Sequence, residues 1–138
     1  MLFSRLSSAA GADRRIGDNL ATVARLLREQ AARLSSRCSP VERDEVKAIL
    51  AELGGRVDAV ARLHQLLAEN PAEGALNLGV YLRDISAAIV AALSSDRDIG
   101  LRFDCDPHCF ALPERALPIG FVVVELVTNA VKYAHRPG

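Results

Sequence analysis

The strongest constraint on the fold is a strict alternation of four- and three-residue steps between apolar positions in the stretch 46–67. Val46, Leu50, Leu53, Val57, Val60, His64 and Leu67 share this seam. Such a repeat places its members on one edge of a helix, where they pack along a neighbouring helix. Ile49, Leu63 and Leu66 widen the edge beyond what a single neighbour covers. The pattern predicts a long helix over Pro40–Glu69 with more than one packing partner.

A second stripe of the same kind precedes the first. Ile16, Leu20, Val23, Leu27 and Leu34 predict a helix over Asp13–Ser36. Ser39-Pro-Val-Glu42 has the pattern of a capping box that starts the next helix. Two long helices with so short a connection form an antiparallel hairpin, and one hairpin cannot bury both stripes. We therefore predict a homodimer built as a four-helix bundle; the alternative is a bundle with the next helix of the same chain.

Shorter elements follow a linker at Asn70–Gly74. Apolar periodicity predicts a helix over Leu78–Ser94. Two short strands are predicted, Leu101–Cys105 and Cys109–Leu112. Pro113 and Pro118 bracket the start of a long final helix. The predicted fold class is therefore α+β and mostly α, with a long helical hairpin at its start.

The final helix carries a distinctive polar group. Glu125, Asn129 and Lys132 lie at i, i+4 and i+7, and Thr128 joins them in one stripe. An amide carbonyl suits a hard cation such as Mg²⁺, an ammonium suits phosphate oxygens, and a carboxylate can orient or deprotonate a nucleophile. The group therefore indicates a magnesium nucleotide; the alternative is the solvated outer face of an amphipathic helix. An apolar stripe is expected opposite, formed by Ile119, Val123, Leu126, Val127, Ala130 and Ala134.

These patterns resemble one family in sequence order. The run E-L-V-T-N-A-V-K-Y-A at 125–134 resembles the N-box of histidine kinases. The stretch Ala116–Phe121 is similar to the lead-in to that box in bacterial HisKA_2 and HWE sensor kinases. Arg15–Leu20 resembles the segment after their phosphoacceptor histidine, and Arg56–Leu67 resembles the second helix of their dimerisation domain.

The resemblance implies a division of the chain and a role in two-component signalling. Residues 1–70 would form a dimerisation and histidine-phosphotransfer-like hairpin. Residues 71–138 would form the first part of a histidine-kinase-type ATP-binding α/β sandwich, ending after the N-box. The implied partners are a second copy of the chain and the receiver domain of a response regulator. The implied cofactors are ATP and Mg²⁺.

The resemblance also assigns roles to individual residues. Asn129 would bind Mg²⁺, Glu125 would orient or deprotonate the acceptor imidazole, and Lys132 would contact phosphate. Tyr133 would belong to the same nucleotide-binding group.

The chain departs from the family in two respects. Arg14 stands where the acceptor histidine is expected, and a guanidinium has no free lone pair to accept a phosphoryl group. The glycine-rich boxes that follow the N-box in relatives are not found before Gly138, so we expect the chain to be inactive by itself. The alternative function is a non-catalytic, histidine-phosphotransferase-like dimeric scaffold that docks a response regulator. An anti-sigma-factor-like kinase shares the N-box, but the long N-terminal hairpin argues against it.

His64 is the one histidine on a helical seam. It is either a displaced phosphoacceptor or regulator contact, or a half-buried structural residue between Val60 and Leu67. A seam position points inward in a bundle, which favours the structural role.

Composition narrows the remaining possibilities. The net charge is zero and aromatic residues make up 4% of the chain, which argues against nucleic acid as a partner. No apolar run long enough to span a bilayer is evident in the sequence, so no membrane span is predicted. Cys38, Cys105 and Cys109 have no disulfide framework spacing and predict a reducing cytoplasm. Cys105-Asp-Pro-His-Cys109 matches no common zinc pattern.

Overall fold

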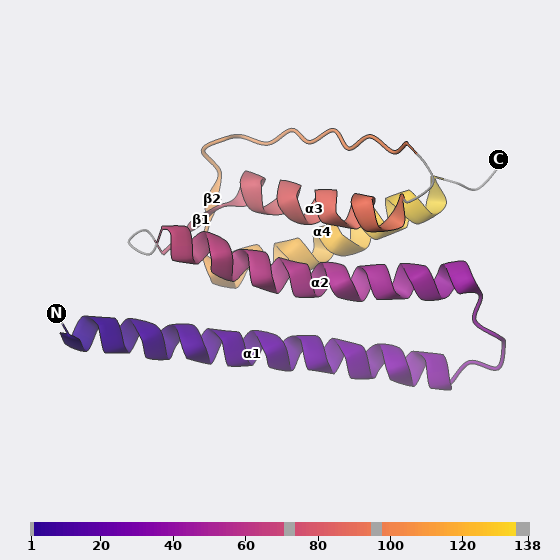
Figure 1. Cartoon of the computed structure of the whole chain (residues 1–138), viewed down its shortest axis with the longest axis horizontal. Coiled ribbons are helices and arrows are strands. Elements are labelled where there is room, and N and C mark those ends of the chain that lie inside the picture. The colour runs from indigo at the N-terminus through magenta and orange to yellow at the C-terminus, as the bar shows by residue number, and fades with distance from the viewer. Residues whose placement is uncertain (1, 71–73, 95–97, 135–138) are drawn as a thin grey trace. The chain divides into compact units, whose positions relative to one another are not determined.

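A computed structural model describes residues 2–70, 74–94 and 98–134, with side chains from residue 14 onward. The chain divides into two compact units, Met1–Pro40 and Val41–Gly138. The described residues form four helices and two short strands (Figure 1). In chain order these are α1 (Leu2–Ser35), α2 (Arg43–Glu69), β1 (Leu76–Asn77), α3 (Leu78–Leu93), β2 (Phe110–Ala111) and α4 (Pro113–Tyr133).

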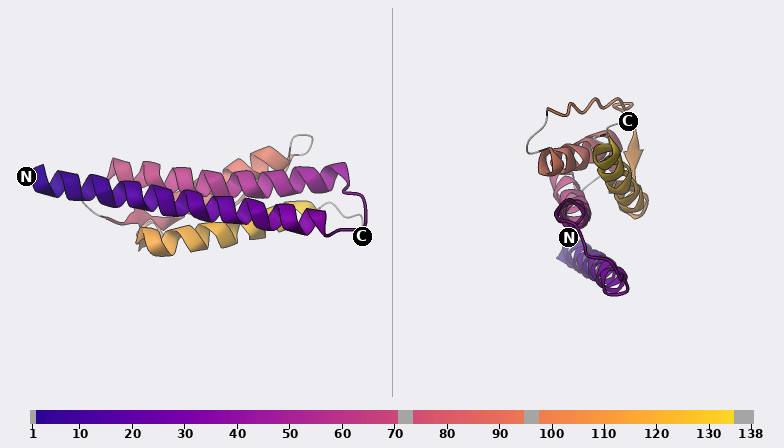
Figure 2. Two further views of the ribbon diagram at one scale, coloured as in Figure 1. Left: turned by 90° about the horizontal axis from the view of Figure 1, so that it is seen from below. Right: turned by 90° about the vertical axis from the view of Figure 1, so that its right-hand side faces the viewer.

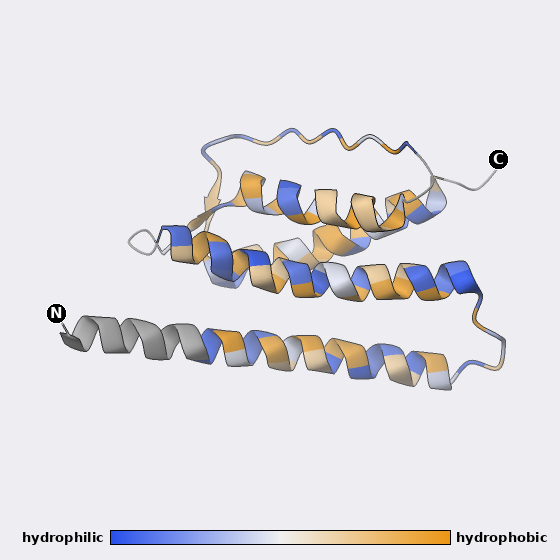
Figure 3. Cartoon of the chain, viewed as in Figure 1, coloured by the Kyte–Doolittle hydropathy of each residue, from blue (hydrophilic) through white to orange (hydrophobic). Residues whose placement is uncertain are grey.

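The first unit consists of α1 and the turn that follows it. The helix was predicted over Asp13–Ser36 and is confirmed, although it begins eleven residues earlier, at Leu2. Apolar residues recur along it as bands (Figure 3), and Ile16, Leu20 and Leu27 remain exposed. An ion pair one helical turn apart, Arg25 to Glu29 at 2.7 Å, lies on its polar side.

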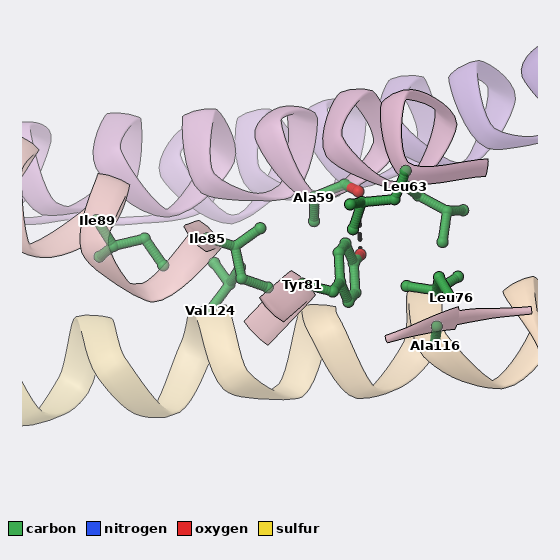
Figure 4. Packing of buried hydrophobic residues seen from close by; sticks show 9 residues of the cluster. Ala59, Leu63, Leu76, Tyr81, Ile85, Ile89, Ala116 and Val124 are labelled. Carbon is green, nitrogen blue, oxygen red and sulfur yellow. Dashed lines mark hydrogen bonds between the residues drawn. The ribbon is translucent and has the colours of Figure 1, made fainter. Parts of the chain in front are cut away.

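The second unit is built on three helices. α2 contacts both α3 and α4, and these two contact each other. α2 runs antiparallel to α3 and α4, which run in the same direction (Figures 1 and 2). The core between them is formed by Ala59, Leu63, Leu66, Leu76, Tyr81, Ile85, Ile89, Ala116 and Val124 (Figure 4). These helices bury one apolar face each, which explains the period of their apolar residues.

Two glycines allow the helices of this unit to approach closely. A Cβ atom on Gly55 of α2 would lie 3.0 Å from Cγ1 of Val124 and 3.1 Å from Cγ1 of Ile89. A Cβ atom on Gly120 of α4 would lie 2.6 Å from the hydroxyl of Tyr81. Helix axes approach to a distance that their contact side chains set, so small residues bring them nearest.

Tyr81 ties α3 to α2 inside the core. Its side chain is fully buried, and its hydroxyl donates a hydrogen bond to the carbonyl of Ala59 at 3.0 Å (Figure 4). Burial raises the pKa of this phenol well above its ordinary value. Arg62 forms a further link between these two helices, since its Nε donates to Asp84 at 2.8 Å.

A small antiparallel sheet closes one end of the three helices. Leu76 pairs with Ala111 and Asn77 pairs with Phe110. The predicted strand at 109–112 is thus present but shorter, whereas the predicted strand at Leu101–Cys105 is wrong. That stretch is coil alongside α3 (Figure 1), because no strand lies beside it among the described residues to complete a ladder. The strand partner of β2 is β1, which the sequence did not predict.

The edge of α2 that enters the core differs from the predicted seam. The buried positions include Gly55, Ala59, Leu63 and Leu66. Val60 of the seam is also buried, but Val46, Leu50 and Val57 are exposed, Leu50 to 63%. Gly55 lies on the core edge because its missing side chain permits the close approach described above.

The start of α2 also differs from expectation. The helix begins at Arg43 with Glu42 as its N-cap and no side-chain capping bond, so the predicted capping box at Ser39 is wrong. The compact units meet at Pro40, because α2 shares its core with α3 and α4. The division into functional regions 1–70 and 71–138 stays a prediction. The mostly helical fold class is confirmed.

Candidate functional site

The polar group predicted on the last helix lies on one exposed stripe of α4. Glu125, Asn129 and Lys132 are all exposed, at successive turns of the helix. Lys132 Nζ lies 6.0 Å from the centre of the Tyr133 ring, at the outer limit of a cation–π contact. The structure thus brings four of the predicted residues together on a rigid element.

Thr128 departs from this group. Its side chain is 2% exposed, so it belongs to the core face of the helix and not to the polar stripe. The reason is its spacing: Thr128 lies one turn after the buried Val124 and nearly one turn before the buried Val131. The sequence prediction that placed it beside Glu125 was therefore wrong.

The apolar stripe predicted opposite the polar group was also wrong in most positions. Ile119, Leu126, Ala130 and Ala134 are exposed, while Val123 and Val127 are partly buried. The buried face is made by Pro113, Ala116, Gly120, Val124, Thr128 and Val131. Gly120 explains why this face is the buried one, because its missing side chain lets α4 pack closely against Tyr81.

As a result, a second apolar surface of α4 stays open. We call it the open α4 face; it consists of Ile119, Val122, Leu126 and Tyr133. Leu126 is 61% exposed. This face lies directly beside the polar stripe on the helix surface, since Val122, Leu126 and Tyr133 occupy the positions next to Asn129.

The chemistry of the polar stripe fits a magnesium nucleotide. The carboxylate of Glu125 and the carbonyl of Asn129 are hard oxygen donors of the kind that Mg²⁺ takes. The ammonium of Lys132 offers three donors to phosphate oxygens. Within the described part of the chain, no hydrogen bond or ion pair engages these three side chains. They are therefore available to a ligand.

The remaining predicted residue belongs to the other unit. Arg14 is exposed on α1 and is followed by Arg15. Residues 14–35 hold five arginines and two acidic residues, which makes α1 basic. His64, on α2, is partly buried, as the seam position predicted. Its structural role stays a prediction.

Asn77 is the structurally important polar residue that the sequence prediction missed. Its Oδ1 accepts a hydrogen bond from Val80 N at 3.1 Å and so caps α3. Its Nδ2 donates to the carbonyl of Pro107 at 3.0 Å. Asparagine immediately before an apolar-periodic segment is an N-cap signal, so this role was detectable. A shallow hollow of about 200 Å³ adjoins it, lined also by Arg83, Phe103 and Cys105.

Two further features of the described residues bear on the site. No group of three His, Cys, Asp or Glu side chains among them lies close enough to hold a metal ion. By length and composition α4 could cross a membrane, which corrects the expectation that no segment was long enough. This is weak evidence for a membrane span, because the same helix carries one face of the core of the second unit.

Comparison with known families identifies the class of protein. The HisKA_2 family model, described as histidine kinase, matches residues 12–93, which is more than half of the chain. The chain therefore belongs to the HisKA_2 histidine kinase family, as its sequence resemblance predicted, and this family implies two-component signalling. The match covers α2, α3 and most of α1 but not α4. No curated protein and no solved structure matches the chain.

Proposed function

We propose that the chain is a histidine-kinase-like signalling module in which α4 supplies the N-box part of a site for ATP and Mg²⁺. The observation that carries this proposal is the exposed stripe of Glu125, Asn129 and Lys132 on one rigid helix. In this proposal Asn129 holds Mg²⁺, Lys132 contacts phosphate and Tyr133 lies beside the nucleotide. Glu125 orients or deprotonates an acceptor imidazole in a complete site.

The open α4 face supports the proposal that residues 71–138 are the first part of an ATP-binding α/β sandwich. A helix of such a sandwich buries one face against a sheet. Ile119, Val122 and Leu126 offer an apolar face of this kind, and β1 with β2 begins a sheet at the start of α4. Neighbouring exposed apolar side chains of this kind are typical of a site of packing or interaction.

The chain itself is not expected to be phosphorylated on α1. Arg14 occupies the position of the acceptor, and a guanidinium offers no free lone pair to a phosphoryl group. Phosphoryl transfer to this position therefore has no nucleophile. Incubation with radiolabelled ATP and Mg²⁺ is expected to leave no acid-labile phosphate on the protein.

Nucleotide binding tests the role of the α4 stripe directly. The probe is Mg·ATP, added to the full chain while backbone amide NMR shifts are followed. We expect shifts centred on 125–133 that are lost in Asn129→Ala and reduced in Lys132→Met, because these residues are proposed to hold Mg²⁺ and phosphate. Arg115→Met is the matched control, because it removes an exposed positive charge almost five turns earlier on α4. Absence of any shift at millimolar nucleotide would contradict the proposal.

We further propose that the chain functions as a cytoplasmic homodimer that meets the receiver domain of a response regulator. The exposed apolar residues Leu20, Leu27, Leu50 and Val57 support an interface formed by α1 and α2 of two copies. Light scattering at increasing protein concentration tests it. A mass that stays monomeric throughout would contradict the homodimer.

The second candidate function is a non-catalytic scaffold that docks a response regulator. The specific observation in its favour is the basic surface of α1, where Arg14 replaces the acceptor. The phosphoacceptor site of a receiver is acidic, so the charges are complementary. A chain that binds a receiver domain in a salt-dependent manner but shows no shift with Mg·ATP would favour this function over the first.

A further inference from the structure

The segment Cys105–Cys109 is fastened to the start of α3 at three points. The carbonyl of Pro107 accepts a hydrogen bond from Asn77 Nδ2 at 3.0 Å. The carbonyl of Cys109 accepts one from Leu78 N at 2.9 Å. The sulfur of Cys105 lies against Gly79, 3.2 Å from the position that a Cβ atom would take. The two cysteines therefore meet consecutive residues of the same helix end.

A tight turn connects the two cysteines. Cys109 N donates to the carbonyl of Asp106 at 3.1 Å, and His108 N donates to Asp106 Oδ1 at 2.8 Å. A hydrogen bond of this i to i+3 type holds the first and last Cα atoms of a turn within about 7 Å. Cys105 immediately precedes the turn and Cys109 ends it. This limit applies to Asp106 and Cys109; Cys105 adjoins Asp106 and, like Cys109, is held at the start of α3. A disulfide between the two cysteines requires their Cα atoms to be about 4.4–6.8 Å apart.

Both thiols are accessible to a reagent. Cys105 and Cys109 are free and partly exposed, and Cys105 borders the shallow hollow beside α3. Nothing in the proposed nucleotide site or in the core of the second unit uses either thiol. A partly exposed cysteine pair outside that core is available for redox chemistry.

We propose that Cys105 and Cys109 form a reversible intramolecular disulfide, with a small-molecule disulfide such as oxidised glutathione as the oxidant. One cysteine thiolate attacks a sulfur of the reagent, forms a mixed disulfide and releases one thiol. The second cysteine, deprotonated, attacks the mixed disulfide at the protein sulfur and releases the second thiol. The protein loses two electrons and two protons, and the reagent disulfide is reduced to two thiols. In a reducing compartment such a bond is transient and serves as a redox sensor.

The position of this pair gives the bond a structural consequence. β2 begins at the residue after Cys109, and α4 begins two residues after β2 ends. The same turn holds the capped end of α3 through Asn77. A disulfide would therefore restrain the segment that connects α3 to α4, the helix that carries the N-box stripe. Hydrogen exchange at Leu78 N, which bonds to Cys109, is expected to slow in the oxidised chain.

Tryptic mapping of the full chain tests the proposal, because Phe103–Arg115 carries both cysteines and Cys38–Arg43 carries the third. After oxidised glutathione, residual thiols are alkylated before digestion. We expect Phe103–Arg115 to have lost two hydrogens and to carry no glutathione or alkyl group. Cys38 is exposed in the other unit and serves as the internal control, which should carry a mixed disulfide. Reduction should restore both thiols.

The single variants separate a pair from two independent thiols. In Cys109→Ser, the mixed disulfide on Cys105 has no resolving partner and is expected to accumulate on Phe103–Arg115. Cys105→Ser should leave the corresponding adduct on Cys109. Independent glutathione adducts on both cysteines of the unaltered chain, with no loss of two hydrogens, would overturn the proposal. If oxidation leaves the hydrogen-exchange rate at Leu78 N unchanged, the proposed restraint of the segment between α3 and α4 is overturned.

Discussion

α2 has two apolar edges, and they have different surroundings. Its core edge, formed by Gly55, Ala59, Leu63 and Leu66, is buried against α3 and α4. Its seam edge, formed by Val46, Leu50 and Val57, follows the heptad spacing but remains exposed. Regular spacing therefore identifies an amphipathic helix without identifying the edge that its neighbours cover. That choice depends on where small side chains permit close packing.

The largest expected difference between the two edges comes from truncating one leucine on each. Leu63→Ala removes a fully enclosed side chain, so we expect a loss of about 2–5 kcal/mol in the free energy of unfolding. Leu50→Ala at a dilute, monomeric concentration should cost within about 0.5 kcal/mol, because that side chain is largely exposed. Urea denaturation followed by circular dichroism measures both.

The same pair of variants sharpens the interpretation of the seam edge. If two copies cover it at higher concentration, Leu50→Ala becomes costly as the protein is concentrated, whereas the cost of Leu63→Ala stays constant. Equal costs for the two variants in the dilute monomer would contradict the burial of the core edge.

Replacing each of two adjacent glycines on α2 by alanine gives the next largest expected effect on stability. The two replacements should change the free energy of unfolding in opposite directions. A Cβ atom on Gly55 meets Val124 at 3.0 Å, so Gly55→Ala should destabilise the protein by about 1–3 kcal/mol through overpacking. Gly54 has open space around it and lies inside the helix, so Gly54→Ala should stabilise it by about 0.4–1 kcal/mol. Thermal unfolding of both variants decides the matter. A stabilising Gly55→Ala would show that α2 does not approach α4 closely.

Much of the helical architecture could be predicted from apolar period, but the burial of α4 could not. The spacing of Glu125, Asn129 and Lys132 correctly placed them on one exposed stripe. The prediction that Thr128 lies on the exposed stripe was wrong. Successive helix positions are about 100° apart, so whether a residue at the border is buried depends on how wide a face the neighbouring helices cover. The contact between Gly120 and Tyr81 determines which face of α4 is buried. Such a contact joins two helices, so the spacing of residues within α4 does not reveal it.

The two strands show a similar limit. Pairing of β1 with β2 joins residues more than thirty positions apart, Leu76 and Ala111. β1 has only two residues, too few for alternation to stand out in the sequence. By contrast, Asn77 carries a local N-cap signal, so its role at the start of α3 is detectable from the sequence.

Tyr81→Phe is expected to have a smaller effect than either core change above. The ring still fills the core, but the buried carbonyl of Ala59 loses its donor, for a cost of about 1–1.5 kcal/mol. The raised pKa of Tyr81 adds a dependence on pH. Because the folded-state pKa lies above the unfolded value, this stability is fully present below about pH 10 and is lost as the pH rises further.

Denaturation at pH 8 and at pH 11 separates these two contributions. The unaltered chain should lose stability between these pH values through ionisation of the unfolded phenol, and Tyr81→Phe should lose less. A pH dependence identical in both proteins would show that Tyr81 does not make the buried contact.

The smallest expected effect concerns the ion pair that links α2 to α3 beside the core edge. Arg62 Nη2 lies 2.7 Å from Asp84 Oδ2, and the Nε of the same arginine donates to that oxygen at 2.8 Å. The side chains are 29% and 32% exposed, so solvent screens their attraction. A double-mutant cycle of Arg62→Met and Asp84→Asn should give a coupling energy of about 0.2–1 kcal/mol that falls with added salt. The adjacent Arg83 lies 3.7 Å from Asp84 and is 58% exposed, so Arg83→Met is the matched control and should couple more weakly. A coupling at Arg83 equal to that at Arg62 would mean that the pair acts as surface charge and does not orient α3 against α2.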